Sequence, residues 1–162
     1  SRLNHIFPNT LVLPELQVDE RVMIVPGTDG KKMSKSYNNV IDIFLPDKKL
    51  RKQIMSIKTD SIPMAESKDA ESCNVFKIYR LLASEEKAIE IKAKYKAGNY
   101  GYGDAKQELF ELICEKFKVE RAKFNHLMKH KDILDLELKK GAEKARVIAR
   151  EVLDRVRKNI GY

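Results

Sequence analysis

The sequence predicts a mainly α-helical protein that begins with a small α/β portion. Short β-branched runs lie near the N-terminus, whereas the remainder consists of longer stretches with apolar residues at helical spacing. Strands followed only by helices are typical of the end of one domain and the start of a helical one. We therefore expect residues 1–45 to complete an α/β domain and residues 46–162 to form a helical domain.

Two runs near the N-terminus predict buried strands. Residues 10–13 (TLVL) and 21–25 (RVMIV) consist mostly of aliphatic and β-branched side chains. Pro14 ends the first run and Pro26 ends the second, because proline lacks the N–H that a central ladder requires. The segment after Pro26 is therefore expected at the carboxyl end of a strand, where ligands bind in open α/β sheets.

The first helix of the second domain is expected over residues 48–55. Asp47 is a suitable N-cap, because its carboxylate can accept a hydrogen bond from a free N–H of the first turn. Leu50 and Ile54 are four residues apart, so they lie on one face. We expect that face to pack in the core.

Two further helices carry their own start and stop signals. Asn74 is predicted to cap a helix over residues 75–83. Ser84, followed by two glutamates, predicts the start of the next helix, because acidic side chains stabilise the N-terminal end of the helix dipole. Gly98 is the expected end, since glycine adopts the left-handed conformation that follows many helices.

A long helix is expected from about Asp104 to Leu127, after a turn that contains Tyr100 and Tyr102. We interpret these two tyrosines as packing residues and not as platforms for RNA bases. Gly141 is predicted to precede a separate last helix. The expected inner face of that helix comprises Ala142, Ala145, Ala149, Val152, Val156 and Ile160.

Composition limits the classes of function. The 162 residues carry a net charge of +8 with 35% charged side chains, which favours a polyanionic partner such as nucleic acid or, equally, a lysine-rich helical surface. Cys73 and Cys114 are isolated, so we expect no disulfide framework, no metal site and a reducing cytoplasm. No apolar run approaches the length of a membrane span, so no membrane partner is expected.

Residues 26–39 (PGTDGKKMSKSYNN) have the composition of a phosphate-binding loop. Gly27 and Gly30 allow a tight turn and are candidate hinges for closure of the loop. Lys31, Lys32 and Lys35 supply mobile charges, and the intervening serines supply hydroxyl donors. The alternative interpretation of such a loop is a solvated basic turn.

The segment Lys32-Met33-Ser34-Lys35-Ser36 resembles the KMSKS motif of class I aminoacyl-tRNA synthetases, and its context resembles the tryptophanyl-tRNA synthetases, with the tyrosyl enzymes as nearest relatives. Segments such as residues 59–61 (TDS), 95–98 (YKAG) and 141–146 (GAEKAR) extend the resemblance over essentially the whole chain. The resemblance implies the last strands of a Rossmann catalytic domain, then a helical anticodon-binding domain. It further implies that the chain is the C-terminal part of a longer enzyme.

The resemblance implies ATP, with Mg²⁺ on its phosphates, as the loop's ligand. Lys35 is then the first candidate for stabilising the charge that develops on the leaving pyrophosphate, and Lys32 is the second. ATP contacts are also expected from five other residues, the last two of which have strand core as the alternative interpretation. They are Met33, Ser34, Ser36, Val22 and Met23.

For the helical domain the resemblance implies recognition of tRNA(Trp). Basic and imidazole side chains can hold phosphates or stack on bases. Alternatively, they interact with helix dipoles or pair with neighbouring acids such as Glu143, Glu151 and Asp154. The candidates for tRNA contact are Arg121, Lys123, His126, His130, Lys144, Arg146 and Arg150.

The remaining expectations concern the intact enzyme. The resemblance implies a homodimer with its tryptophan pocket in the preceding half, so this chain alone is expected to be inactive. Three alternatives stay open: part of a tyrosyl-tRNA synthetase, a stand-alone tRNA-binding module and an inert truncated domain. The module would bind tRNA in a salt-sensitive manner without a preceding half.

Overall fold

The computed structural model describes residues 2–19 and 23–162, and these residues divide into two compact units. One unit comprises Val18–Phe124, and the other combines Ser1–Gln17 with Asn125–Tyr162. The described residues are mainly helical, as the sequence predicts.

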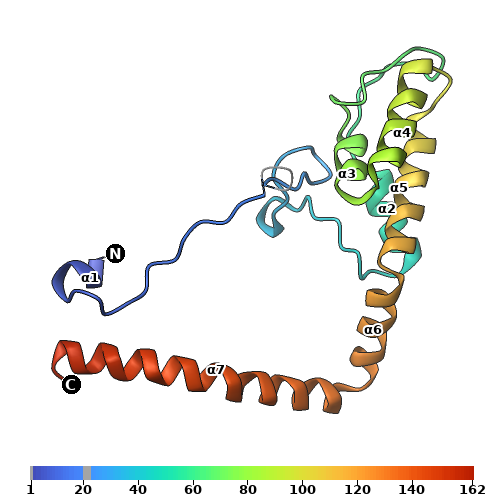
Figure 1. Cartoon of the computed structure of the whole chain (residues 1–162). Helices are drawn as coiled ribbons and strands as arrows, with labels where there is room; N and C mark the ends of the chain where they lie inside the picture. Colours follow the sequence, from blue (N-terminus) through green and yellow to red (C-terminus); the bar gives the residue numbers. More distant parts are fainter. Residues whose placement is uncertain (1, 20–22) are drawn as a thin grey trace. The chain divides into compact units, whose positions relative to one another are not determined.

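The unit Val18–Phe124 is a bundle of short helices. Helix α5 packs against α2 and α3, and α3 also packs against α4, as Figure 1 shows. A 3₁₀ helix, η2, precedes them, and helix α6 follows. The bounds are η2 Lys35–Tyr37, α2 Asp47–Met55, α3 Asn74–Leu82, α4 Glu85–Ala97, α5 Tyr102–Lys116 and α6 Lys118–Lys129.

The core of this unit is formed by the apolar stripes that the sequence predicts. Leu50 and Ile54 of α2 are fully buried, and Leu109 of α5 is buried between the helices that α5 contacts. Tyr95 and Tyr100 contact each other edge to face with ring centroids 5.2 Å apart. Tyr100 is therefore a packing residue, and burial raises the pKa of its hydroxyl.

Capping explains where α4 starts and stops. The Ser84 hydroxyl accepts a hydrogen bond from the Lys87 N–H, as predicted for an N-cap. Gly98 has φ 77°, and a Cβ there would lie 2.6 Å from the Ala65 carbonyl oxygen, so only glycine fits.

The start residues of α2 and α3 differ by one from the predicted ones. Asp47 and Asn74 are the first helical residues and not the caps, and neither side chain caps its own helix. Their side chains make tertiary contacts instead: the Asp47 carboxylate accepts from Arg121, and the Asn74 amide donates to the Lys58 carbonyl. Tertiary pairing has taken the place of local capping at both positions.

The prediction of one continuous helix from Asp104 to Leu127 is wrong. The segment consists of α5 and α6, which are interrupted at Phe117 with φ −104° and ψ 19°. The Phe117 ring packs partly buried against the core, and its N–H still donates to the Ile113 carbonyl. The apolar periodicity continues through this break, so the sequence gives no sign of it.

The other unit contains α1, Arg2–Ile6, and the long helix α7, Lys131–Ile160. Thr10 links the two segments of this unit: its carbonyl accepts from Arg155 Nε and its hydroxyl from Asn159 Nδ2, both at 2.8 Å. Thr10 is fully buried.

Helix α7 differs from the predicted last helix in two respects. It runs through Gly141 without a break, because one glycine costs a helix only about 1 kcal/mol. Its predicted inner face is also largely exposed: no α7 residue is buried, and only Val152 and Val156 of that face are partly covered.

The predicted α/β portion is not present in the described residues. No strand forms at residues 10–13, where Thr10 instead bonds to α7, so that prediction was wrong. Arg21 and Val22 of the second predicted strand lie outside the described residues, and Met23, Ile24 and Val25 are exposed. A strand is defined by its hydrogen-bonded neighbour. Among the described residues, the β pairing consists of one isolated bridge between Pro26 and Lys32.

None of the described helices is both long enough and apolar enough to span a membrane.

Candidate functional site

Residues 25–33 form a tight turn that is closed by backbone hydrogen bonds. The Gly27 N–H donates to the Lys31 carbonyl at 2.7 Å, and the Met33 N–H donates to the Val25 carbonyl at 2.8 Å. The lysine-rich segment therefore extends from a defined backbone conformation.

Both glycines of this turn are required by close packing. A Cβ at Gly27 would lie 2.5 Å from Asn39 side-chain and backbone atoms. Gly30 has φ 80°, and a Cβ there would lie 2.4 Å from Asn74 Oδ1. This packing favours a fixed turn at the two glycines over the predicted hinges.

The turn is attached to the helical bundle at its base. The Lys58 N–H donates to the Thr28 carbonyl at 2.8 Å, and the Lys58 carbonyl accepts from the Asn74 side chain at 2.9 Å. Asn74 is the first residue of α3 and also the residue against which Gly30 packs. The contacts of Lys58 and Asn74 thus attach the loop to the start of α3.

After the turn, the chain passes through Ser34 in an extended conformation and enters η2. The hydroxyls of Ser34 and Ser36 are hydrogen-bonded to each other at 2.8 Å. Asn38 ends η2 in the left-handed conformation with φ 52°, which asparagine tolerates better than most residues. The two serine hydroxyls therefore lie together on the exposed side of the loop, where ligand oxygens can reach them.

The Asn39 side chain holds the two halves of the loop together. Only 2% exposed, it accepts from the Ser34 N–H at 2.8 Å through Oδ1. Its Nδ2 donates to Asp29 Oδ1 at 2.7 Å and to the Lys32 carbonyl at 3.1 Å. The hydrogen bond from Asn39 lowers the pKa of the Asp29 carboxyl below its usual value. Buried amides that make several such bonds fix the backbone around them.

The side chains of the loop lysines, Lys31, Lys32 and Lys35, are exposed. Within the described part of the chain, none of their ammonium groups has a hydrogen-bond or ion-pair partner. Asp29 is the nearest acid in sequence: its carboxylate accepts hydrogen bonds from the Lys31 N–H and from Asn39, and the Lys31 charge adds to the lowering of its pKa. The arrangement is a fixed backbone that presents unpaired cations, and such a surface can bind an anion such as phosphate.

Met33 and Met23, the two described apolar candidates for ATP contact, differ in burial. Met33 is partly buried against the helical core and lines an apolar hollow with Ile41 and Phe117. Met23 is 63% exposed. Val22 lies outside the described residues.

Arg121 is held by the fold. Its side chain is only 15% exposed, and its guanidinium donates to the Asp47 carboxylate at 2.6 Å and to the Leu45 carbonyl at 2.8 Å. It also contacts Cys114 Sγ at 3.2 Å. These contacts favour a structural role over contact with RNA.

The candidates Lys123 and His126 on α6 and His130, which directly follows α6, are exposed. His126 and His130 have ring centroids 4.5 Å apart, and Lys123 lies on the same helix as His126. The described residues contain no group of three or more metal-ligating side chains, so these rings are not part of such a cluster.

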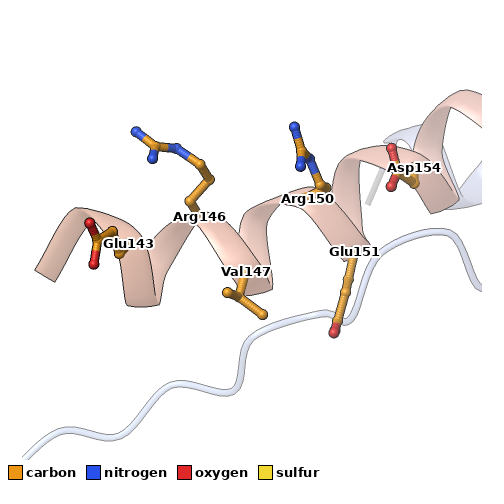
Figure 2. Close-up of a pocket in the computed structure, with 6 residues that line it drawn as sticks. All are labelled: Glu143, Arg146, Val147, Arg150, Glu151 and Asp154. Carbon is orange, nitrogen blue, oxygen red and sulfur yellow. The ribbon is translucent and has the colours of Figure 1, made fainter. Parts of the chain in front are cut away.

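The α7 candidates lie on an exposed helix, and three acidic residues lie beside Arg146 and Arg150. Figure 2 shows Arg146 and Arg150 extending from the same side of α7, whereas Val147 and Glu151 extend from the other. In the described structure neither arginine pairs with Glu143, Glu151 or Asp154, so the alternative of ion pairing is not realised. Lys144 is likewise exposed.

Comparison with known families gives this geometry a context. Residues 2–118 match the family described as tRNA synthetases class I (W and Y). The chain belongs to this family. The lysine-rich loop of this synthetase chain, residues 26–39, lies within the matched residues.

Individual relatives are similar over almost the whole chain. The tryptophan–tRNA ligase of Campylobacter jejuni strain RM1221 is 44% identical over 99% of this chain and 50% of the relative. The ligase of Rhodopirellula baltica is 44% identical over 98% and 49%, and that of Fusobacterium nucleatum is 46% identical over 92% and 46%. The chain spans about half the length of these curated relatives.

A solved structure of a relative is similar in both fold and sequence. The crystal structure of C. jejuni tryptophanyl-tRNA synthetase complexed with ADP and tryptophan has a TM-score of 0.83 and 44% identity. The match covers 99% of this chain and 50% of that one.

Sequence reasoning missed the two residues that organise this synthetase loop. Asp29 and Asn39 lie ten residues apart, and only the folded turn brings their side chains within 2.7 Å. One signal was available: a short polar residue on each side of a glycine-lysine segment often bonds to the nearby backbone. The signal does not reveal which backbone groups are bonded.

Proposed function

We propose that this chain is the C-terminal part of a tryptophan–tRNA ligase that activates tryptophan with ATP and transfers it to tRNA(Trp). The main support for this proposal is the fixed loop, which presents Lys31, Lys32 and Lys35 without hydrogen-bond or ion-pair partners among the described residues. The 44% identity to the C. jejuni ligase over 99% of this chain supports the same proposal. The relatives' names favour tryptophan over the tyrosine alternative.

The proposed chemistry requires cations at the pyrophosphate. The tryptophan carboxylate attacks the α-phosphorus of ATP, the bond to the β-phosphate oxygen breaks, and pyrophosphate leaves with increased negative charge. Cations that interact more strongly with this charge than with bound ATP lower the barrier. We assign this role first to Lys35 and second to Lys32, with Lys31 as a weaker neighbour.

The other loop groups support nucleotide binding. The paired hydroxyls of Ser34 and Ser36 are exposed donors for phosphate oxygens. ATP would bring Mg²⁺ bound to its phosphate oxygens. When bound, Mg²⁺ supplies neutralising charge on those oxygens.

Adenine contacts are a further part of the proposal. Exposed Met23 and its neighbour Val22 remain our candidates for the adenine edge. Met33, which packs against the helical core, is better suited to supporting the loop.

The helical part is proposed to bind tRNA(Trp). Exposed cations without partners lose little by exchanging water for phosphate. On the described helices Lys123, Lys144, Arg146 and Arg150 satisfy this condition, and the exposed rings of His126 and His130 can stack on unpaired bases. Arg121 is the weakest candidate because the fold already binds its guanidinium.

Several proposals concern the part of the relatives that this chain does not span. We place the tryptophan pocket and most of a homodimer interface in that part. The division into a Rossmann end at residues 1–45 and an anticodon-binding domain at 46–162 belongs to the same proposal, as does a cytoplasmic location. This chain alone is then inactive.

Amino-acid-dependent pyrophosphate exchange with the full-length protein tests the function. We expect exchange with tryptophan and none with tyrosine, and none from the 162-residue chain. Exchange with tyrosine only would overturn the substrate. A protein that binds tRNA but catalyses no exchange with any amino acid would instead be a binding module.

A further inference from the structure

The loop contains one polar side chain that is buried and fully bonded. Asn39 is 2% exposed, and its amide bonds to Asp29, Lys32 and Ser34 at 2.7, 3.1 and 2.8 Å. Its own carbonyl also accepts from the Thr28 N–H at 2.9 Å. One residue therefore joins the turn before the lysines to the segment that carries them.

The bonded positions include Lys32 and directly precede Lys35. The carbonyl of Lys32 and the N–H of Ser34 are both held by the same amide, and Lys35 begins η2 directly after Ser34. The backbone from which Lys32 and Lys35 project is thereby fixed, whereas their ammonium groups are exposed.

We propose that Asn39 is a positioning residue for adenylate formation, holding the backbone of Lys32 and Lys35 where their side chains reach the ATP phosphates. This inference rests on the proposed function. Fixing a catalytic group in advance removes an entropy cost from the barrier, and a displacement of about 1 Å can reduce a rate about 10²-fold.

Asparagine is the side chain that this position requires. The amide donates to Lys32 and Asp29 and accepts from Ser34, so a carboxylate would lose the donors. Position 27 must in turn lack a side chain, because a Cβ on Gly27 would lie 2.5 Å from Asn39 atoms. The absence of a side chain at position 27 and the amide at position 39 are therefore two parts of one arrangement.

The test uses two variants of the full-length protein, Asn39→Ala and the nearly isosteric Asn39→Asp. We expect single-turnover formation of tryptophanyl-adenylate to slow about 10²-fold in each, with the affinity for tryptophan changed less than threefold. The matched control is Asn38→Gly, because Asn38 is exposed, has φ 52° and makes no side-chain hydrogen bond to a described residue. Its rate should stay within threefold of the wild type.

A purely structural role predicts another pattern. The variants would then melt at a lower temperature but form adenylate at the wild-type rate well below that temperature, which would overturn the proposal. If Asn39→Ala does not fold, Asn39→Asp provides the same comparison.

A rescue experiment tests the pairing with Asp29. Asn39→Asp places a second carboxylate beside Asp29, and adding Asp29→Asn restores a donor between the two positions. We expect the double variant to be about tenfold faster than Asn39→Asp. The hydrogen bond between positions 29 and 39 is restored, whereas the one to the Lys32 carbonyl is still missing. A double variant no faster than Asn39→Asp would overturn this pairing. If the wild-type protein forms no tryptophanyl-adenylate, the proposed function fails; if it does and Asn39→Ala matches it, only this inference fails.

Discussion

Two groups of cations that have no ion-pair partner among the described residues project from different kinds of backbone. The loop lysines project from a turn fixed by a buried amide and attached to the start of α3. The α7 cations Lys144, Arg146 and Arg150 project from a helix with no buried residue (Figure 2). The charges are alike, but a buried side chain holds the backbone beneath them only in the loop.

This difference separates two uses of positive charge. A cation that stabilises a transition state must be placed precisely, and the loop fixes the backbone from which Lys32 and Lys35 project. Cations that attract a polyanion act through summed charge and tolerate imprecise placement. We therefore expect single substitutions to have large effects in the loop and small ones on α7.

The largest effect is expected for Lys35→Ala in the full-length protein. Loss of one charge contact made in the transition state typically costs about 10²–10³ in rate, or roughly 2.7–4 kcal/mol. Single-turnover adenylate formation should fall by this factor while tryptophan affinity stays constant. The control is Lys48→Ala, an exposed lysine of α2, which should leave the rate unchanged. An unaltered rate in Lys35→Ala would remove that residue from the mechanism.

Arg121 provides an intermediate case, a cation with partners. Arg121→Ala leaves the Asp47 carboxylate and the Leu45 carbonyl without their donor, and hydrogen bonds to charged groups contribute about 1.5–3 kcal/mol. We expect the free energy of unfolding to fall by that amount in chemical denaturation. The exposed neighbour Lys123→Ala should change it by less than about 0.5 kcal/mol. Equal stabilities of the two variants would contradict the structural assignment of Arg121.

Replacing a glycine by alanine should have opposite effects on stability in the loop and in α7. Gly27→Ala forces a Cβ into Asn39 and should destabilise the protein by more than about 1 kcal/mol. Gly141→Ala meets nothing within 4 Å on α7 and should stabilise it by up to about 1 kcal/mol. Thermal unfolding of the two variants measures both effects. A destabilising Gly141→Ala would show that α7 bends at this residue or is covered there in the full-length protein.

The smallest effects are expected on α7. Arg146→Ala and Arg150→Ala should each weaken tRNA binding modestly and reduce the slope of log affinity against log salt by about 1. Titrations of tRNA(Trp) at several salt concentrations measure this slope. Arg80→Ala, whose side chain pairs with Glu71, is the control and should leave the slope unchanged. An unchanged slope in both α7 variants would remove these arginines from the RNA-binding face.

Local signals predicted the helical bundle well. Ser84 and Gly98 delimit α4 because capping depends on neighbouring residues alone, and Leu50 and Ile54 are buried because their spacing fixes a common face. The break at Phe117 and the exposed face of α7 were not predictable. Periodicity describes which residues share a face, whereas burial depends on whether another segment covers it.

The loop was only partly predictable for a similar reason. The motif identified Lys32 and Lys35 as candidates, but the roles of Asp29 and Asn39 depend on a fold that brings them together. The failed strand at residues 10–13 shows the same limitation, since Thr10 bonds to residues more than 140 positions away.

The buried amide of Asn39 also has a kinetic consequence. Rotation about the bonds of a lysine side chain takes picoseconds to nanoseconds and leaves the peptide in place. Any larger excursion of the segment between Lys32 and Ser34 must first break hydrogen bonds to that amide. The ammonium groups can therefore change position quickly. The peptide beneath them changes conformation only as often as the hydrogen bonds of the Asn39 side chain break.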